Sequence, residues 1–573
     1  MIMFVCHRHS TPWLALLWLV GASGGVQAAA ALGAADGNSP LPAAQAALQR
    51  GDCGVASTRY RQAAQKSAQA ELAAQATAVA LACGQSTEAR LAAQRWLQLA
   101  PGDSSAGMAQ VRAELAGYRI AEARALFQSW LGAGDRKVSE AIDALAQSAG
   151  TEPTYAMLRE LQHPALKEAA VQRALAALAL DAWDASGALR FAQGARSAGA
   201  AAKGSAKELA ELTARAQAIL GNESAALSAA HEAGSDQGAR LSAAEVQLLL
   251  GKTEQGQSAL DGLRSDPEVG PAARRQLAQL AFEQGEYAVA EQRCTALLHE
   301  PQSAPVAVYL LGMINERRGD EATALRNYQL LLGSGFDAQG KRRAAAILYR
   351  QGERAAALRL FEPPRGAEPG ERIHADIEAA DLLSLVDAPE EALARIDGAL
   401  RRSPGNAELD YQRGVLLERS GKLDAALSLL ESLHRARPLD AAITNALGFT
   451  LADHRRALPR AEQLIRAALQ AQPDSPAILD SLGWVLYRRG QPKAAVPVLA
   501  RAYRLLHDGD IGAHWGEALW ADGQQAAARG AWQRALAADP DNTRLAATAK
   551  RFIPGLAAPK PPPALEAAPR TSI

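Results

Sequence analysis

The chain is poor in the residues that build sheets and disulfide frameworks. Aromatic residues make up only 5% of the 573 residues, and there are four cysteines. β-branched and aromatic side chains favour strands, whereas Ala and Leu favour helices. An apolar fraction supplied largely by Ala and Leu therefore predicts an all-α fold. Four cysteines are too few for a disulfide-stapled fold. A net charge of zero argues against a protein whose main work is neutralising a nucleic-acid backbone.

Catalytic and cofactor motifs are also missing. After residue 28 the sequence contains no H-E-x-x-H, G-x-x-x-x-G-K-[ST], G-x-S-x-G, G-x-G-x-x-G or C-x-x-C. These patterns supply metal ligands, phosphate-binding loops, nucleophiles and redox thiols. The run His507-Asp508-Gly509-Asp510 has the composition of a metal loop, but it falls between two predicted helix pairs, where polar turn residues are expected. We predict no enzyme, no cofactor, no metal site and no nucleic-acid partner.

The first 28 residues have the pattern of an export signal. Arg8 precedes an apolar core at 13–20, and small residues end at Val26-Gln27-Ala28. This order is typical of a secretory signal peptide over residues 1–28, and the core is shorter than the about 20 residues of a membrane-spanning helix. An uncleaved anchor is the alternative. Because no cysteine follows the core, lipid anchoring in the outer membrane is not expected. The mature chain is predicted to be periplasmic or otherwise exported, without an integral membrane span.

A glycine recurs about every 34 residues along most of the chain. The recurring positions are Gly51, Gly84 and Gly117, then Gly251, Gly285, Gly319 and Gly352, then Gly421, Gly490 and Gly523. A small residue usually stands seven positions before this glycine and another five positions after it, which lets two antiparallel helices approach closely. Prolines such as Pro404, Pro438 and Pro473 stand between units, where Pro ends one helix or begins the next. A further turn is predicted near 454–459.

This pattern resembles the tetratricopeptide repeat (TPR) family over about residues 40–550. The resemblance implies an all-α solenoid, a superhelix of about 13–14 antiparallel helix pairs in which stacked neighbours supply the core. We predict a short linker at 29–39, TPR-like repeats at 40–129, degenerate helical repeats at 130–235, further repeats at 236–366 and C-terminal repeats at 367–556. The pattern sets no register for 130–175. The Pro- and Ala-rich tail at 557–573 is predicted to be disordered.

Two cysteines lie beside neighbouring turns. Cys53 follows Gly51 by two residues, and Cys83 precedes Gly84 by one. Adjacent repeats stack their turns side by side, and an exported compartment is oxidising. We therefore predict a Cys53–Cys83 disulfide, with two small buried residues at helix ends as an equal alternative. Cys294 occupies a column of larger apolar residues, so we predict a buried free thiol there.

The resemblance also implies a binding groove, because the first helix of each TPR pair lines the concave side. The fifth, ninth and twelfth residues of such a helix share one face. In four successive repeats these are Tyr411, Val415 and Glu418; Asn445, Phe449 and Ala452; Asp480, Trp484 and Tyr487; Ala513, Glu517 and Trp520. We predict partner contacts by Tyr411, Asn445, Phe449, Asp480, Trp484, Tyr487, Glu517 and Trp520. Two alternatives remain open: a terminal helix fills this face, or the aromatic residues are inter-helix core.

Three phrases in the C-terminal half carry a closer resemblance. They are Asn445-Ala446-Leu447-Gly448-Phe449, Leu479-Asp480-Ser481-Leu482-Gly483-Trp484 and Ala513-His514-Trp515-Gly516-Glu517. They are similar to the long envelope TPR proteins of proteobacteria, a branch that includes a lipoprotein adaptor of a carboxy-terminal processing protease. Those members carry a lipid-modified cysteine that this chain lacks.

The combined expectation is an exported scaffold or adaptor that binds other proteins or peptides. The resemblance implies delivery of substrates to a periplasmic processing protease. An envelope-assembly or polysaccharide-secretion scaffold is the alternative function.

Overall fold

The computed structural model describes residues 40–132, 137–199, 203–364, 366–539 and 542–556. The predicted signal peptide, the linker and the tail lie outside these residues. The described residues form thirty-one α-helices and no strand, which confirms the all-α solenoid. None of these helices is both long and apolar enough to cross a bilayer.

The first half of the solenoid contains eight antiparallel pairs, each of a first and a second helix. The first four are α3 (Leu41–Arg50) with α4 (Cys53–Lys66), α5 (Ala70–Ala82) with α6 (Ser86–Leu99), α7 (Ser104–Ala116) with α8 (Ile120–Leu131), and α9 (Val138–Ala149) with α10 (Thr151–Leu158). A 3-10 helix, η3 (Pro164–Lys167), follows. The next four are α11 (Ala169–Asp181) with α12 (Ala185–Ser197), α13 (Lys203–Leu220) with α14 (Glu223–Glu232), α15 (Gln237–Leu249) with α16 (Thr253–Asp261), and α17 (Gly270–Glu283) with α18 (Tyr287–Leu297).

The second half contains seven pairs and a terminal helix. These are α19 (Ala304–Arg318) with α20 (Glu321–Gln329), α21 (Asp337–Arg350) with α22 (Arg354–Arg359), α23 (Pro369–Leu385) with α24 (Pro389–Arg402), and α25 (Ala407–Arg419) with α26 (Leu423–Ala436). They continue with α27 (Ala441–Asp453) and α28 (Leu458–Ala471), α29 (Pro476–Arg488) and α30 (Pro492–Leu505), and α31 (Gly509–Ala521) and α32 (Gln525–Ala538), and end at α33 (Thr543–Phe552). The described chain thus holds fifteen pairs, more than the predicted 13–14.

The excess pairs come from turns outside the series of recurring glycines, at Gly150, Trp183, Gly221 and Asp387. Each of the fifteen turns within a pair contains a residue with positive φ, and in four turns that residue is not glycine: those at Tyr118, Trp183, Asp387 and Arg455. The predicted turn at Gly117 is therefore corrected by one position, since Gly117 itself has φ −88° and Tyr118 has φ 56°. Trp183 and Asp387 continue the period of about 34 in stretches where the glycine signal is absent. The turn predicted near 454–459 is present, with Arg455 and Ala457 at positive φ.

The small residues hold each pair together as predicted. An added Cβ at Gly448 would lie 2.7 Å from Ile465, and Leu499 and Trp532 leave no room for one at Gly483 and Gly516. First helices of successive pairs also contact one another, as in α27 with α29 and α29 with α31. Because helices inside a curve lie closer together than those outside it, the first helices of these C-terminal pairs line the concave face.

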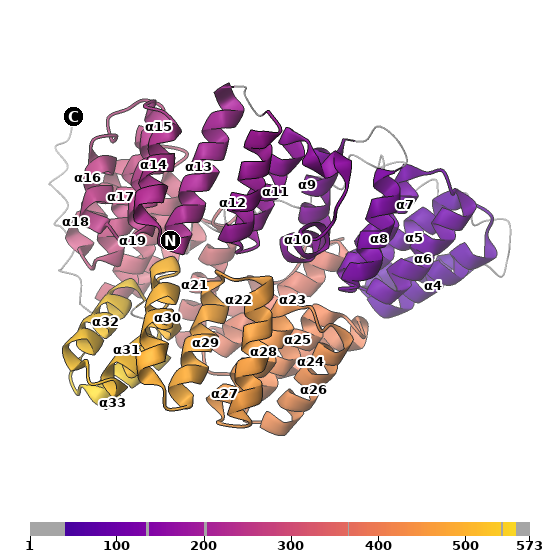
Figure 1. Cartoon of the computed structure of the whole chain (residues 1–573). Coiled ribbons are helices and arrows are strands. Elements are labelled where there is room, and N and C mark those ends of the chain that lie inside the picture. The colour runs from indigo at the N-terminus through magenta and orange to yellow at the C-terminus, as the bar shows by residue number, and fades with distance from the viewer. Residues whose placement is uncertain (1–39, 133–136, 200–202, 365, 540–541, 557–573) are drawn as a thin grey trace, which may run out of the picture.

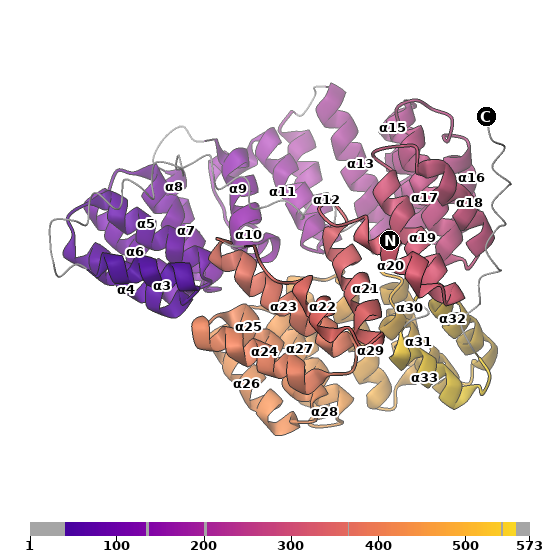
Figure 2. The same cartoon turned by 180° about the vertical axis from the view of Figure 1, so that it is seen from behind.

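The solenoid makes more than one superhelical turn, and its two halves lie side by side. In Figure 1 the pairs α3–α18 form an upper row and α24–α33 a lower row; both rows run in the same direction, and Figure 2 shows the same neighbours from behind. We call the contact between the rows the seam. Its contacts run from Asn406 with Cys83 and Arg437 with Ala116, through Arg159 with Ala471 and Asp474 with Trp183, to Arg504 with Ala218 and Tyr287 with Ala537.

Most seam contacts use a polar group of one row to satisfy a helix end of the other. Arg504 donates to the carbonyl oxygens of Ala218 at 3.1 Å and Leu249 at 2.8 Å. The Asp474 amide donates to the Trp183 carbonyl at 2.9 Å, and its carboxylate accepts from the Ala185 amide at 2.8 Å. The last carbonyls of a helix have no partner within it, so the rows cap each other. The junctions between pairs of one row thereby meet the turns within pairs of the other row.

Candidate functional site

The predicted groove positions lie on four neighbouring first helices, α25, α27, α29 and α31. The structure divides them into a tightly packed cluster at the C-terminal end and a more open stretch toward α25. Asp480, Trp484, Ala513 and Glu517 are buried. Tyr411, Asn445, Phe449, Tyr487 and Trp520 are partly exposed.

A buried histidine that the sequence analysis missed is the centre of the cluster. His514 Nδ1 lies 2.9 Å and 3.0 Å from the two carboxylate oxygens of Asp480, and its ring stacks on Trp484 at 4.0 Å between centroids. Burial alone would lower the pKa of His514, but the Asp480 carboxylate outweighs it and the pKa is raised. His514 directly follows the groove position Ala513. Because only the fifth, ninth and twelfth residues of each first helix were counted as groove positions, helical spacing did not select it.

Trp484 is enclosed on several sides. Its indole Nε1 donates to Asp453 at 3.0 Å, the Arg488 guanidinium lies 4.9 Å from the ring centre, and Tyr487 lies 5.1 Å away. Only 4% of its surface is exposed. The bulk of this side chain is therefore inter-helix core, which was one of the alternatives left open by the sequence. Contact of Trp484 with a partner remains a prediction, and only the small exposed edge of its ring could make that contact.

The terminal helix covers the groove at Trp520. The Trp520 ring packs against Trp532 at 5.9 Å and against Phe552 of α33 at 5.5 Å. Arg551 of the same helix pairs with Glu517 at 2.8 Å, and Glu517 also accepts from the Tyr487 hydroxyl at 3.2 Å. At Trp520 the alternative of a terminal helix applies, because α33 occupies the face that earlier repeats leave open.

A cavity of about 400 Å³ remains between α29, α31 and α33. Trp484, Ala513, His514 and Glu517 line it from the first helices. The rest of the wall is formed by Asp453, Arg488, Arg544, Ala547, Thr548 and Arg551. Three guanidinium groups, two carboxylates and an aromatic edge in one cavity offer donors and acceptors together. This combination suits the amide groups and polar side chains of a peptide.

The more open stretch lies on α27. Phe449 is partly exposed, with its ring 6.1 Å from His514. Asn445 lies one helical turn earlier, and its side-chain oxygen is buried without a hydrogen-bond partner among the described residues. Tyr411 is farther along, on α25, where burial raises the pKa of its hydroxyl. Asn445 and Phe449 are therefore the predicted groove residues best placed to meet a partner.

Two groups of metal-ligand residue types already have hydrogen-bond and ion-pair partners within the protein. Glu418, Asp453 and His454 bring ligand atoms within 4.8 Å of one another, but Asp453 is already held by Trp484 and lies 3.6 Å from Arg488 and 3.9 Å from Arg544. In the run 507–510, His507 pairs with Glu283 across the seam, and Asp508 caps α31 by accepting from Asp510 and Ile511. The latter run is a polar junction between helix pairs.

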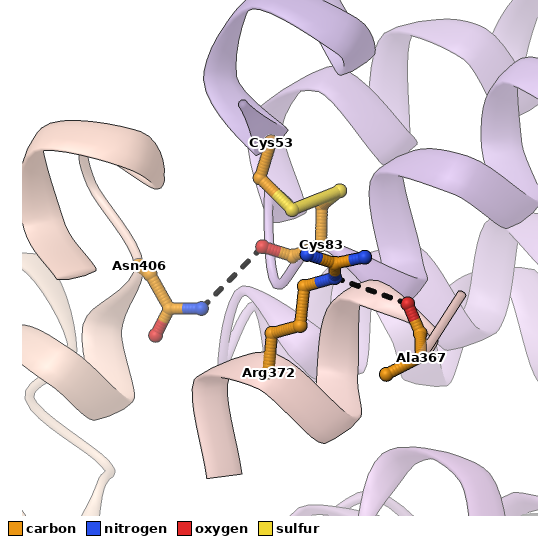
Figure 3. The surroundings of a disulfide bond; sticks show 5 residues. All are labelled: Cys53, Cys83, Ala367, Arg372 and Asn406. Carbon is orange, nitrogen blue, oxygen red and sulfur yellow. Dashed lines mark hydrogen bonds between the residues drawn. A yellow bond between two sulfur atoms is a disulfide. The ribbon is translucent and has the colours of Figure 1, made fainter. Parts of the chain in front are cut away.

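The two cysteines beside the first turns are joined. Cys53 and Cys83 form a disulfide with their Cα atoms 5.3 Å apart. Cys294 is a buried free thiol, as predicted, and burial raises its pKa to about 12. The disulfide lies at the far end of the solenoid from the cavity, against the seam (Figure 3).

No protein-family model matches the chain. A TPR repeat-containing protein of Pseudomonas aeruginosa, PA4667, is 33% identical over 212 residues, which cover 37% of this chain and 36% of that relative. The chain thus spans little more than a third of the relative's length. Among solved structures, yeast Tom70 is 12% identical and aligns over 89% of this chain and 96% of its own, with a TM-score of 0.32. A chain of the APC/C hetero-tetramer Cut9–Hcn1 is 14% identical over 85% of this chain and 96% of its own, with a TM-score of 0.29.

Proposed function

We propose that this chain, a tetratricopeptide-type solenoid by its repeat pattern and its helix pairs, is an exported scaffold that holds partner proteins or peptides on its concave face. The observation that carries the proposal is the polar cavity between α29, α31 and α33. The partly exposed Phe449 lies near it, with its ring 6.1 Å from His514 of the cavity wall. Mixed charges with a few aromatic anchors are typical of protein interaction surfaces.

The disulfide supports the exported location. Structural disulfides persist in oxidising compartments and are rare where thiol reductants dominate. The Cys53–Cys83 pair stands at a Cα separation of 5.3 Å, which is within the range that disulfides require. The signal-like pattern of residues 1–28 supports the same location.

The partner we propose is a periplasmic processing protease together with the substrates brought to it. This step rests on the similarity of the C-terminal phrases to envelope TPR proteins that include a protease adaptor. An envelope-assembly scaffold, such as one that contacts polysaccharide synthase or export subunits, is the second candidate. It shares the concave site and differs only in the proteins that bind there.

Capture from envelope extract tests the binding site. We expect the wild-type chain to retain a defined set of proteins, and the double variant Asn445→Ala/Phe449→Ala to retain less than about a tenth of them, because each lost anchor costs roughly 1–2 kcal/mol. Arg529→Ala is the matched control, since Arg529 is exposed on the second helix α32. Melting temperatures are measured in parallel. Equal capture by the double variant, with unchanged melting, would contradict the proposed site.

The identity of the captured proteins separates the two candidate functions. Recovery of a processing protease, followed by faster cleavage of a co-captured substrate when the scaffold is present, supports the adaptor. Recovery of polysaccharide synthase or export subunits supports the assembly scaffold instead.

A further inference from the structure

The disulfide lies where the first two helix pairs meet α23, α24 and α25 across the seam (Figure 3). Cys53 is the first residue of α4, and Cys83 caps the end of α5. The Asn406 side-chain amide donates to the Cys83 carbonyl at 3.4 Å. The Asn406 oxygen accepts from the amides of Glu408 and Leu409, both at 3.1 Å. One side chain therefore caps α25 and bonds the opposite row.

The two rows approach so closely here that the first row needs glycine. A Cβ added to Gly54 would lie 2.7 Å from the Pro404 ring, and one added to Gly84 would overlap the Asn406 amide. The Arg372 side chain lies over Gly51, with its Nε donating to the Ala367 carbonyl at 3.1 Å. Gly51 and Gly54 belong to the first pair and Gly84 to the second. The docking surface therefore depends on how these two pairs are placed relative to each other.

The placement of the two pairs rests on a fully buried core of small side chains, on larger side chains that are only partly buried, such as Leu72 and Trp96, and on an ion pair between α4 and α6. Of the buried apolar residues in α3–α6, all but Leu41, Tyr60 and the two cysteines are alanine. Alanine side chains interlock weakly because each buries little surface. The disulfide is the one covalent link between the two pairs, and it joins them at the edge that faces the second row.

We propose that the Cys53–Cys83 disulfide is an oxidation-dependent latch that closes the superhelix at its N-terminal end. Once it forms, the turns at Gly51 and Gly84 are aligned, and the segment from Pro404 to Leu409 docks on them. Without it the helices of the first two pairs still form, but this end of the seam opens. The latch requires the oxidising compartment proposed above and is independent of which partner binds the concave face.

The chemistry is thiol–disulfide exchange with an oxidised dithiol oxidoreductase. One cysteine thiolate attacks the disulfide of that protein, and the second then attacks the mixed disulfide. Two electrons and two protons leave the cysteine pair, and the oxidoreductase departs as a dithiol. After docking, Cys53 is 1% exposed and Cys83 is not exposed, so reduction requires the seam to open first. The disulfide therefore forms while the chain folds, and the closed seam then shields it from reductants.

Hydrogen exchange on the full chain tests the latch by comparing the oxidised protein with the variant Cys53→Ser/Cys83→Ser. Amides opened by local fluctuations exchange according to the free energy of that opening. We expect protection of the Glu408 and Leu409 amides to fall at least about tenfold in the variant, while α29–α32 stay unchanged. Unchanged protection at 404–409 would overturn the latch. Protection within α3–α6 that falls to the level of an unfolded segment would also overturn it, because the disulfide would then serve only to keep these helices folded.

A second variant opens the seam with the disulfide intact. Gly54→Leu places a side chain against Pro404, and Gly54 lies in the helix α4, so the substitution suits the local backbone. We expect the same rise in exchange at 404–409, with peptide mapping confirming that Cys53 and Cys83 remain joined. Gly530→Leu is the matched control, because only the mobile end of Arg534 lies near that position. Full protection at 404–409 in Gly54→Leu would show that close approach at this point does not hold the seam, and it would reject the proposal.

Discussion

The first two helix pairs and the last two complete pairs are built to the same plan but stabilised differently. In α3–α6 the buried apolar side chains are almost all alanine. In α29–α32 they include Trp484, Trp532, Tyr503 and several Leu and Ile residues. Hydrophobic stabilisation scales with the apolar area removed from water, at roughly 25 cal/mol per Å². The C-terminal pairs therefore gain much more from packing per residue than the N-terminal pairs.

The two ends of the solenoid also differ in their cross-links, buried polar groups and cavities. The weakly packed end carries the disulfide and a glycine-dependent contact across the seam. The strongly packed end carries a buried His514–Asp480 pair, a terminal helix and a cavity. The cavity is thus found beside the aromatic core, and the covalent link is found beside the alanine-rich core. Four predictions test this contrast.

The largest effect is expected from Trp484→Ala. The side chain is 4% exposed and contacts His514, Tyr487 and Arg488, so its removal leaves a cavity and should cost about 3–5 kcal/mol. Urea unfolding of the C-terminal pairs, followed by the remaining Trp fluorescence, measures the loss. Phe449→Ala, at a partly exposed position, is the control and should cost clearly less. A stability loss below about 1 kcal/mol, together with about thirtyfold weaker partner capture, would show that Trp484 binds the partner and is not part of the core.

Removing the cross-link should weaken the N-terminal pairs by a similar but smaller amount. The sequence separation of Cys53 and Cys83 is 30 residues, and closing a loop of this size stabilises by about 3–4 kcal/mol. The measurement is denaturant unfolding of Cys53→Ser/Cys83→Ser, read from circular dichroism. Cys294→Ser is the control, because Cys294 is a free thiol and its loss should not respond to reductant. Equal stability of wild type with and without dithiothreitol would contradict the assignment.

A buried carboxyl at the seam should make the contact between the halves depend on pH. Burial raises the pKa of Glu152 to about 7; Tyr118 donates to it, and Asp440, Arg159 and Arg437 are the neighbouring charges. The folded protein binds the proton more tightly than the unfolded chain, whose value is about 4.3. Stability is therefore lost as pH rises from about 4.3 to about 7 and stays lower above that.

Glu152→Gln tests this pH dependence. The stability advantage of the variant over wild type should grow by about 2–3 kcal/mol between pH 5 and pH 8, since wild type loses about 1.4 kcal/mol per pH unit up to the folded pKa of about 7. Denaturant unfolding at the two pH values measures the difference. The same difference at both pH values would mean that packing, and not ionisation, distinguishes the two side chains.

The smallest effect is expected at the other end of the molecule, from His514. Its pKa is raised by Asp480 against the opposing effect of burial. A group whose folded pKa exceeds the unfolded value of about 6.5 stabilises fully below that pH and loses this contribution as pH rises through the folded pKa. The melting temperature of wild type should therefore fall from pH 6 upward more than that of His514→Gln. NMR titration of the ring in Asp480→Asn should give a lower pKa; an unchanged value would remove Asp480 as the cause.

The repeat period was readable from the sequence wherever glycine marks the turn. Gly51, Gly84 and Gly490 all adopt positive φ, a conformation that costs glycine little. Trp183 and Asp387 adopt the same conformation without that marker, and Trp183 is held by a backbone hydrogen bond from Asp474 across the seam. The positive φ of Trp183 could not be predicted from the local sequence, because the segment that holds this turn lies about 290 residues away.

The groove residues could be placed on their helices from spacing, but their surroundings could not. Trp484 and Trp520 occupy the same kind of position as Phe449 in successive repeats. The structure covers Trp520 with Phe552 and leaves Phe449 partly exposed. Helical periodicity gives the direction of a side chain, whereas its exposure depends on which distant segment packs above it.

Local sequence pattern was enough to predict the all-α class, the period of about 34, the close approach of paired helices at small residues and the neighbouring positions of Cys53 and Cys83. These properties follow from contacts within one repeat or between adjacent repeats, where spacing along the chain equals spacing in space. The tertiary structure alone decided that the superhelix returns to touch itself. The small rotation between successive repeats accumulates over many pairs, and only this sum brings Asn406 to Cys83 and Arg504 to Ala218.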